Sequence, residues 1–269
     1  MTPLLPAFVG TPELDRVYHT DLLTLCNAIE PQSVDMILCD PPYGTTACAW
    51  DTVIPFEPMW AAFKRVIKPR GAIVLTASQP FTSALVMSNP RWFRYEWVWL
   101  KEQGKQPQMA NRRPQKAHES VLVFSAEAPV YYPQFWKDAP YNKKAATKPQ
   151  SKTHAPGFYG LEKRNQVLRY PMSYLYFATE TGLHPTQKPV ALFRYLIRTY
   201  TQPGELVLDP TCGSGTTGVA ARQEARHFII GDSSAEYVEV ARRRLAEPYT
   251  IDMFAGIASS TTPAKAGSL

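Results

Sequence analysis

The chain has 269 residues, 45% of them hydrophobic, which is enough apolar material for one large folded domain and argues against intrinsic disorder. No run approaches the roughly 20 apolar residues of a membrane-spanning helix, and the first residues lack the basic start and apolar centre of a secretion signal. A soluble, cytoplasmic protein is therefore expected. Four cysteines without a C-x-x-C pair and five dispersed histidines indicate no disulfide framework and no zinc site, so no metal is predicted.

The net charge of +6 comes from the middle of the chain. Residues 101–182 hold 13 Lys and Arg against 6 Asp and Glu, whereas the rest of the chain holds 16 against 17. Aromatic residues alternate with these cations, as in VYYPQFWKDAPYNKK at 130–144. Because cations bind phosphates and aromatic rings stack on unpaired bases, the segment is typical of nucleic-acid binding. A solvated loop with a few packed rings is the alternative.

The first part of the chain alternates short strand and helix signals. DRVYHTD at 15–21 and VDMILCD at 34–40 predict strands that end in aspartate, with a helix over 22–29 between them. Apolar residues at helical spacing predict a second helix over 57–67, which leads into a strand at 71–77.

Two further strand-like runs, at 93–102 and 119–126, close this first block. The alternation then resumes with a helix at 189–200, a strand at 205–209, a helix at 216–222, a strand at 227–232 and a last helix at 237–245. Ser233 and Glu236 form a capping-box pattern for the last helix. Strands alternating with helices predict an α/β fold with a mostly parallel, doubly wound sheet covered on both faces.

The stretch ILCDPPYGTT at 37–46 places two prolines directly after an apolar run. Pro41 and Pro42 cannot donate to a sheet ladder, and each fixes its φ angle, so the backbone must leave the strand stiffly. Asp40 and Tyr43 flank them. A carboxylate, a free carbonyl and a ring are thus expected at the carboxyl end of a strand, where open α/β sheets bind their ligands.

The stretch VLDPTCGSGTTGVAA at 207–221 predicts a strand, a tight turn and a helix. Asp209 ends the strand, while Gly213 and Gly215 permit the turn and a close approach of the backbone to a ligand. Asp232 ends the next strand, about 20 residues further on, where an acidic side chain binds ribose hydroxyls in nucleotide-binding sheets. A phosphate-binding P-loop is disfavoured because no Gly-Lys-Ser/Thr follows, and a purely structural turn is the alternative.

Three motifs in this order, DPPYG at 40–44, HPTQKP at 184–189 and DPTCGSGTT at 209–217, resemble the S-adenosylmethionine-dependent DNA amino-methyltransferases of the β group. The resemblance covers roughly residues 14–246 and implies a Rossmann-like methyltransferase fold. It also implies a catalytic half at 1–125, an inserted target-recognition region at 126–182, a cofactor-binding half at 183–248 and a flexible tail at 249–269.

The resemblance implies methylation of an amino group on a base that has left the duplex. The Asp40 carboxylate and the Pro41 carbonyl would accept the amino hydrogens and aim the nitrogen at the donor methyl. Pro42 would stiffen this corner, and Tyr43 would stack on the extruded base. Aspartate as first residue of the tetrapeptide is typical of enzymes acting on adenine, and serine of those acting on cytosine, so Asp40 favours adenine N6.

Other functions stay open at this point. Cytosine N4 presents an equivalent amine to the same acceptors, so the chemistry does not exclude a cytosine enzyme. The same tetrapeptide could also serve an RNA base or a protein glutamine, and a DNA-binding module without activity is the non-enzyme alternative. The basic, aromatic middle segment and the motif order favour DNA.

The resemblance also assigns the binding residues of the cofactor, S-adenosylmethionine. Asp209, Gly213 and Gly215 would line its methionine part, Asp232 would bind the ribose and Asp21 the adenine ring. A helix N-cap is the alternative for Asp21, and a solvated charge at a helix start is the alternative for Lys188. The further cofactor candidates are Thr186, Lys188, Thr211, Ser214 and Thr216.

Double-stranded DNA is the implied partner. Ten basic residues of the middle segment are candidates for contacts with phosphates or guanine edges: Lys105, Arg112, Arg113, Lys143, Lys144, Lys148, Lys152, Lys163, Arg164 and Arg169. The basic run at 101–118, which contains glycine and proline, predicts a mobile loop that orders over DNA. Dimers are common in this group, which favours a homodimer. A cognate restriction endonuclease is a further candidate partner, which the sequence alone does not identify.

Overall fold

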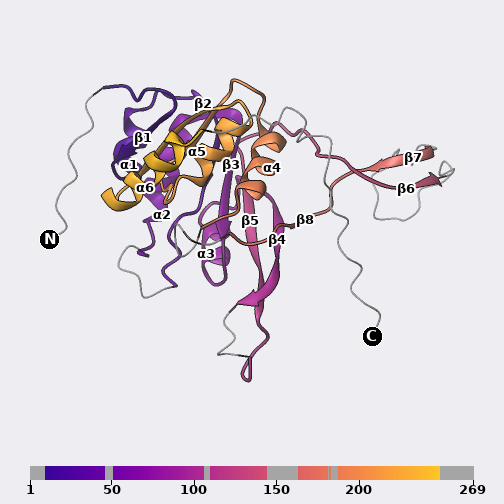
Figure 1. Cartoon of the computed structure of the whole chain (residues 1–269). Helices are drawn as coiled ribbons and strands as arrows, with labels where there is room; N and C mark the ends of the chain where they lie inside the picture. The colour runs from indigo at the N-terminus through magenta and orange to yellow at the C-terminus, as the bar shows by residue number, and fades with distance from the viewer. Residues whose placement is uncertain are drawn as a thin grey trace. The chain divides into compact units, whose positions relative to one another are not determined.

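The computed structural model divides the chain into two compact units (Figure 1). One lies within Met1–Tyr132 and Ser173–Met253, and the other within Pro133–Met172 and Phe254–Leu269. The described residues are 10–45, 51–105, 110–143, 163–180, 182 and 187–248, and for 105, 137–143 and 163–166 the backbone alone is described. The tail predicted at 249–269 lies outside the described residues.

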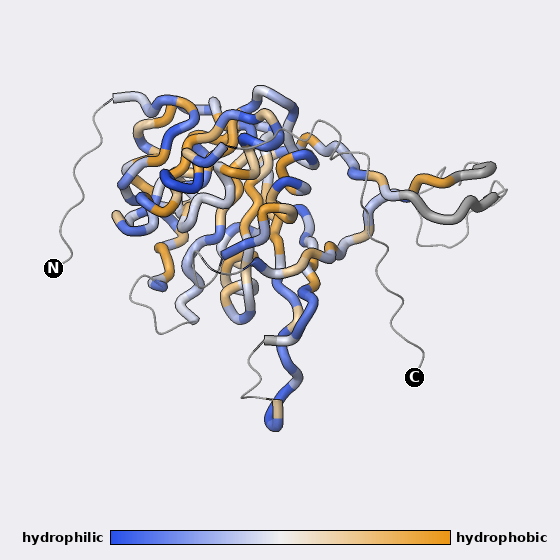
Figure 2. Tube along the Cα trace, viewed as in Figure 1, coloured by the Kyte–Doolittle hydropathy of each residue, from blue (hydrophilic) through white to orange (hydrophobic). Residues whose placement is uncertain are grey.

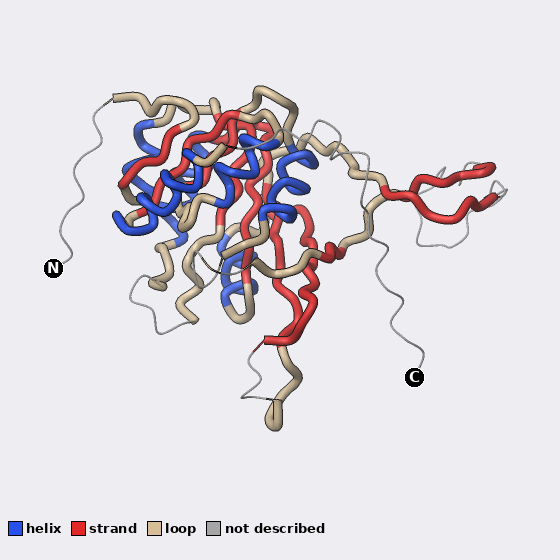
Figure 3. The backbone as a smooth tube through the Cα atoms, in the orientation of Figure 1, coloured by secondary structure: helices blue, strands red, loops and turns tan. Residues whose placement is uncertain are grey.

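The first unit is built on an eight-stranded sheet (Figure 3). Its strands are β1 Arg16–His19, β2 Val34–Cys39, β3 Ile67–Ala77, β4 Phe93–Lys105, β5 Lys116–Phe124, β8 Tyr174–Tyr176, β9 Leu206–Asp209 and β10 His227–Asp232. Their order in the sheet is β1-β10-β9-β2-β3-β5-β4-β8. The first five of these are mutually parallel, β5 is antiparallel to both of its neighbours, and β8 is parallel to β4. This confirms the predicted α/β fold with a mostly parallel sheet.

In the described part of the chain, three helices cover each face of the sheet. One face carries α1 Leu22–Ala28, α2 Phe56–Val66 and α3 Phe81–Ser88, and the other carries α4 Val190–Tyr200, α5 Thr216–Gln223 and α6 Ala235–Ala246. Along β2 the side chains alternate between the two cores, with Met36 and Leu38 in one and Ile37 and Cys39 in the other. Successive strand residues point to opposite faces, so the central strands are apolar along their length (Figure 2).

The helices predicted at 57–67 and 189–200 are confirmed to within one residue. Helix α2 buries Met59, Trp60, Phe63 and Val66, four side chains that share one face at helical spacing. Helix α4 does the same with five large apolar side chains, from Leu192 to Tyr200. None of the described helices is both long and apolar enough to span a bilayer.

The predicted capping box at Ser233 is wrong by one residue. The N-cap of α6 is Ser234, whose side chain accepts a hydrogen bond from the Tyr237 backbone N–H at 3.4 Å. The reason lies in the preceding aspartate, because Asp232 Oδ1 accepts the Ser234 N–H at 2.8 Å. This Asx-turn carries the chain one residue further before the helix begins.

The loop predicted at 101–118 is too long, because β4 continues to Lys105 and β5 begins at Lys116. These two residues pair with each other, after a register shift that starts at Leu100. A polar composition fits a solvated pair of strands as well as a loop. The antiparallel pairing between β4 and β5 extends both strands into this run. Residues 106–109 lie outside the described residues.

The second unit contains an antiparallel pair, β6 Trp136–Lys143 and β7 Lys163–Arg169. The sequence gives no strand prediction for either segment. At the base of the pair the rings of Phe135 and Tyr170 lie 4.7 Å apart, and Trp136 Nε1 donates to the Tyr170 carbonyl at 3.3 Å. Exposed large apolar side chains of this unit are Phe135, Val167, Leu168, Tyr170 and Met172.

Candidate active site

The two sequence motifs meet at the carboxyl edge of the sheet. Strands β2 and β9 are parallel neighbours, with Met36 opposite Val207 and Ile37 opposite Leu208, so Asp40 and Asp209 end adjacent strands. Thr211 Oγ1 donates to the Asp40 carbonyl at 3.4 Å and joins the glycine turn to the proline corner. The register of the sheet therefore places the two motifs side by side.

Both motifs open onto one cavity of about 790 Å³. Its wall includes Asp40–Tyr43 from the proline corner and Asp209–Ser214 from the glycine turn. Asp21, Lys188 and Asp232 complete the wall on other sides. A cavity of this volume holds a ligand of nucleoside size and more.

The glycine turn needs its glycines for two different reasons. Gly213 has φ 49° and Gly215 has φ 79°, a region that other residues rarely adopt. A Cβ at Gly215 would also lie 2.8 Å from the Cβ of Ala241, so this glycine lets α5 and α6 pack closely. The Gly213 N–H donates to Asp232 Oδ2 at 2.9 Å, which joins the turn to the end of β10.

Asp209 is 2% exposed and shapes the turn from within. Its Oδ1 accepts the Thr211 N–H at 3.0 Å, and its Oδ2 accepts Thr217 Oγ1 at 2.5 Å. Burial raises the pKa of Asp209 to about 7, although these hydrogen bonds act in the opposite direction. The carboxyl is therefore near half-ionised at neutral pH.

This raised pKa predicts a pH-dependent stability. The folded state binds the Asp209 proton more tightly than the unfolded chain, so this residue's contribution to stability is full below about pH 4 and is lost as the pH rises through about 7. Asp209→Asn cannot ionise and should flatten that decline. Chemical unfolding of the wild type and the variant from pH 4 to pH 8 measures the difference, and parallel curves would contradict it.

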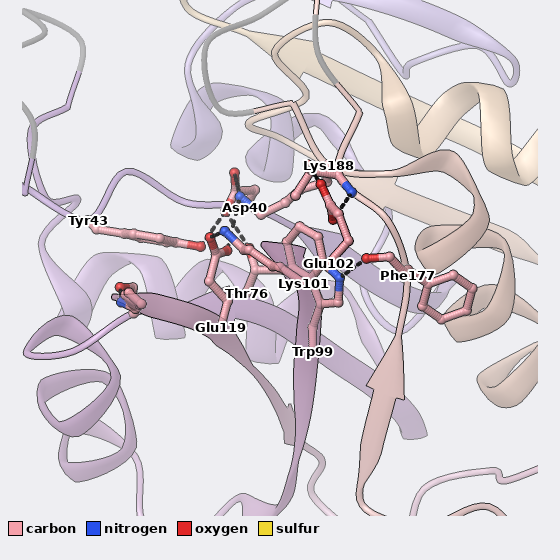
Figure 4. A network of polar contacts seen from close by, with 12 residues as sticks. Asp40, Tyr43, Thr76, Trp99, Lys101, Glu102, Glu119, Phe177 and Lys188 are labelled. Atoms are coloured by element: carbon pink, nitrogen blue, oxygen red, sulfur yellow. Dashed lines mark hydrogen bonds and ion pairs between the residues drawn. The ribbon is translucent and has the colours of Figure 1, made fainter. Parts of the chain in front are cut away.

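Three donors hold the Asp40 side chain in place (Figure 4). Its Oδ1 accepts the Tyr43 hydroxyl at 2.5 Å and also accepts Thr76 Oγ1, while its Oδ2 accepts Lys188 Nζ at 2.5 Å. Thr76 lies on β3 beside the end of β2, because Cys39 is opposite Leu75. The backbone after Tyr43 is fixed as well, since Asp51 accepts the N–H groups of residues 44 and 45, each at 2.8 Å.

The Tyr43 ring is also held in place. It stacks on Phe81 with centroids 5.2 Å apart and an interplanar angle of 23°, and Lys188 Nζ lies 5.6 Å from its centroid. Burial, followed by the charge of Asp40, raises the pKa of Tyr43 well above its ordinary value, so the hydroxyl stays a donor. The stiffness expected from the two prolines thus extends to the carboxylate and the ring beside them.

Beyond Asp40 the polar network continues through Lys188 to Glu119 and Lys101. Lys188 Nζ lies 3.5 Å from Glu119 Oε2, and Lys101 Nζ donates to Glu119 Oε1. Burial alone would raise the pKa of Glu119, but the charges of Lys188 and Lys101 outweigh it and lower that pKa. Burial alone would lower the pKa of Lys188, but Asp40 and Glu119 raise it. Glu119 and Lys188 are therefore both ionised at neutral pH.

Comparison with known proteins decides the family. The model of a family described as DNA methylase matches residues 34–243, which is most of the chain. The chain belongs to this family. The methylase is therefore an S-adenosylmethionine-dependent DNA amino-methyltransferase, of the class that acts on adenine N6 or cytosine N4.

Individual relatives agree with this membership. The methylase is 26% identical to the Type II methyltransferase M2.DpnII of Streptococcus pneumoniae over 256 residues, covering 84% of this chain and 88% of that protein. The M1.HpyAVI–SAM complex matches at 26% identity and a TM-score of 0.58, covering 85% and 98% of the two chains. The PvuII DNA methyltransferase, cytosine-N4-specific, shares the fold, with a TM-score of 0.62 at 19% identity over 91% and 90%.

The cavity of the methylase fits such a donor. S-adenosylmethionine carries a sulfonium cation and a nucleoside, and carboxylates of Asp21, Asp40 and Asp232 line the same cavity as the glycine turn. Each Asp232 oxygen accepts one backbone N–H, which fixes the carboxylate beside the glycine turn. Asp21 is the N-cap of α1, accepting Thr24 N–H at 2.9 Å and Thr24 Oγ1 at 2.7 Å, and it also lines the cavity, so the N-cap role exists beside the predicted cofactor contact.

The other predicted residues are placed as follows. Ser214 and Thr216 are buried next to Arg244, whose Nη1 lies 3.3 Å from the Ser214 carbonyl and 3.0 Å from Thr216 Oγ1. Lys188 is buried against Asp40, an ion pair that the sequence does not predict. Residues outside the described part of the chain are Thr186, Lys144, Lys148 and Lys152.

Among the basic candidates, Arg112 and Arg113 lie exposed between β4 and β5, and Arg169 ends β7. Candidates whose backbone alone is described, all in strands, are Lys105, Lys143, Lys163 and Arg164. In the described residues no group of His, Cys, Asp and Glu could hold a metal ion.

Proposed function

We propose that the methylase transfers a methyl group from S-adenosylmethionine to the N6 amino group of adenine in DNA, with Asp40 and the Pro41 carbonyl as acceptors. The observation that carries this proposal is the common cavity, in which a rigidly held Asp40 and the glycine turn lie on one wall. The cofactor supplies an electrophilic sulfonium methyl group when bound. The amino nitrogen of adenine is a weak nucleophile because its lone pair is delocalised into the ring.

The chain's own residues would localise that lone pair. Two acceptors that each take one amino hydrogen draw the nitrogen toward tetrahedral geometry and orient its lone pair at the methyl carbon. Such acceptors help most when they are already in place, and the Tyr43 and Thr76 hydroxyls on Asp40 Oδ1 provide this. Tyr43, already oriented by Asp40 and Phe81, would stack on the extruded base.

Adenine is favoured over cytosine by the residue that begins the tetrapeptide. Aspartate at this place is typical of adenine enzymes in the β group, and the cytosine enzyme among the structural neighbours shares the fold alone. Family membership also favours DNA over the RNA base and the protein glutamine. The test is digestion of unmethylated DNA after reaction with labelled donor. N6-methyl-2′-deoxyadenosine as the labelled nucleoside supports the proposal, and N4-methyl-2′-deoxycytidine refutes it.

On the cofactor side, we assign Asp232 to the ribose, Asp21 to the adenine ring and the turn from Asp209 to Gly215 to the methionine part. Asp21, Asp232 and the turn residues 209–214 all line the same cavity, which supports this assignment. Thr186, from the segment before α4, is assigned to the methionine carboxylate on the resemblance alone, whereas Lys188 pairs with Asp40 and is not assigned to the cofactor.

DNA would approach the carboxyl edge of the sheet. Strand β4 runs parallel to β3, since both are antiparallel to β5, so the β4–β5 connection with Arg112 and Arg113 leaves from the same edge as Asp40. The exposed rings of Phe135 and Tyr170, which flank β6 and β7, and the basic candidates in these strands support target recognition by the segment 126–182, between the catalytic half, 1–125, and the cofactor half, 183–248. A homodimer stays an expectation, and a cognate endonuclease is suggested by the Type II name of the relatives.

Replacing both Arg112 and Arg113 by glutamine should weaken DNA binding uniformly across sequences. Each lost phosphate contact lowers the slope of log K against log salt by about one. Fluorescence anisotropy with a labelled duplex at several salt concentrations measures this slope. Arg91→Gln is the matched control, because Arg91 is equally exposed but precedes β4 at the opposite edge of the sheet. Equal slopes for the double variant and the wild type would exclude these arginines from the DNA surface.

A further inference from the structure

Lys188 occupies the acceptor that the target amine needs. Its ammonium group lies 2.5 Å from Asp40 Oδ2, and the side chain is only 6% exposed. The other oxygen, Asp40 Oδ1, already accepts hydrogen bonds from Tyr43 and Thr76. Since a carboxylate oxygen has two lone pairs, Oδ2 is the oxygen left for the amine, and it is shared with a cation.

That cation is also unfavourable for the reaction itself. The amino nitrogen gains positive charge as the methyl group is transferred, and an ammonium group on the same carboxylate raises the energy of that charge. The effect is strong in a buried site, where water screens little. Lys188 must therefore leave Asp40, or be neutralised elsewhere, before transfer can be fast.

Glu119 provides the second position. Its Oε2 is buried without a hydrogen-bond partner in the described residues, and Lys188 Nζ lies 3.5 Å away. Closing this distance by roughly 0.7 Å would give the ~2.8 Å of a charge-assisted hydrogen bond, and a further rotation of the Lys188 side chain must take Nζ out of hydrogen-bond reach of Asp40 Oδ2. Glu119 is itself held by Lys101 through its other oxygen, so the receiving carboxylate is fixed (Figure 4). Apart from this long ion pair, Oε2 has no hydrogen-bond partner in the described residues, so a lone pair is available for a closer contact with the Lys188 ammonium group.

We propose that Lys188 is a positioning residue that occupies the amine site on Asp40 in the absence of a base and moves onto Glu119 when the target amine enters. The inference rests on the proposed function, in which Asp40 accepts the amine. The ammonium group stays protonated throughout, so no proton is gained or lost in the exchange. Asp40 thereby keeps a hydrogen-bond partner before the base arrives, and Glu119 gains one afterwards.

The alternative is a static ion pair that joins β2, β5 and the segment before α4. The two can be separated with Glu119→Gln and the double variant Glu119→Gln/Lys188→Met. In the static alternative, transfer follows the integrity of the ion pair, so any recovery of transfer in the double variant is matched by a recovery of the melting temperature. In the exchange, the single variant leaves Lys188 on Asp40 with nowhere to go, and the second substitution frees Asp40 again.

The experiment measures tritium transfer from labelled S-adenosylmethionine to unmethylated amplified genomic DNA under steady state, with cofactor binding by calorimetry and folding by thermal melting. Glu119→Gln should lower kcat about 10- to 100-fold while the Kd for the cofactor changes less than about two-fold. The double variant should transfer at least about ten-fold faster than Glu119→Gln. Glu96→Gln, an exposed carboxylate on β4, is the matched control and should transfer at the wild-type rate.

A double variant no faster than Glu119→Gln, or a Glu119→Gln enzyme at the wild-type rate, would overturn the exchange. If Glu119→Gln does not fold, Glu119→Asp serves in its place, because the shorter side chain draws the carboxylate away from Lys188. Asp40→Ala in the same assay distinguishes a failure of the proposed function from a failure of the Lys188 exchange. Wild-type transfer by Asp40→Ala refutes the proposed function, whereas an inactive Asp40→Ala with a slow double variant refutes the exchange alone.

Discussion

Asp40→Ala should lower methyl transfer by about 10³-fold or more while leaving the affinity for S-adenosylmethionine within about two-fold of the wild type. The carboxylate faces the amine side of the cavity, and its removal leaves the Pro41 carbonyl as the remaining acceptor there. The amino lone pair would then stay delocalised in the ring. The glycine turn keeps its own contacts, through Asp209 and Asp232, so the cofactor site should persist.

Single-turnover transfer to unmethylated DNA and calorimetric titration with the cofactor measure the two quantities separately. Glu30→Ala, an exposed carboxylate in the loop before β2, is a suitable control for the general effect of losing a negative charge. Asp40→Asn adds a graded test, since an amide oxygen accepts a hydrogen bond but no longer pairs with Lys188 as an ion. Residual transfer above a tenth of the wild-type rate in Asp40→Ala would show that another group accepts the amine.

Local signals in the sequence are sufficient to predict the elements that bear Asp40 and the glycine turn. Two prolines after an apolar run end β2 at Asp40, and two glycines after β9 define the turn, because these residues restrict or free the backbone wherever they occur. Both faces of the sheet are buried, so the central strands are apolar runs. These runs predict the central strands. The strand ends were less predictable where pairing partners decide them, as in the extension of β4 and β5.

The network around Asp40 could not be predicted, because strand order decides it. Strand β5 lies between β3 and β4, and this order brings Glu119, opposite Trp99, to the edge where Thr76 and Asp40 already lie. Glu119 and Lys101 are ordinary charged residues in the sequence, without a motif of their own. The weak available signal is a charged residue near a strand end, Lys101 late in β4 and Glu119 early in β5. Topology, and not local composition, thus turns a tetrapeptide into an oriented acceptor.

Gly215→Ala should destabilise the fold by about 2–5 kcal/mol, the sum of two effects. The first is the left-handed backbone conformation, which costs a residue with a Cβ about 1 kcal/mol. The second is overpacking, because the new Cβ would lie 2.8 Å from the Cβ and 3.1 Å from the Cα of Ala241. Neither atom of Ala241 can rotate away, so α5 and α6 must separate and the cofactor turn at the start of α5 must shift with them.

Gly204→Ala isolates the first effect from the second. Gly204 has nearly the same backbone conformation, φ 83° against 79° at Gly215, and a Cβ there would meet nothing within 4 Å. Its replacement should therefore cost about 1 kcal/mol and leave cofactor binding intact. Urea unfolding of both variants measures the difference, and calorimetry shows whether Gly215→Ala also weakens S-adenosylmethionine binding. Equal destabilisation would mean that the contact between α5 and α6 adjusts freely, in which case the glycine turn is not fixed by the packing of these helices.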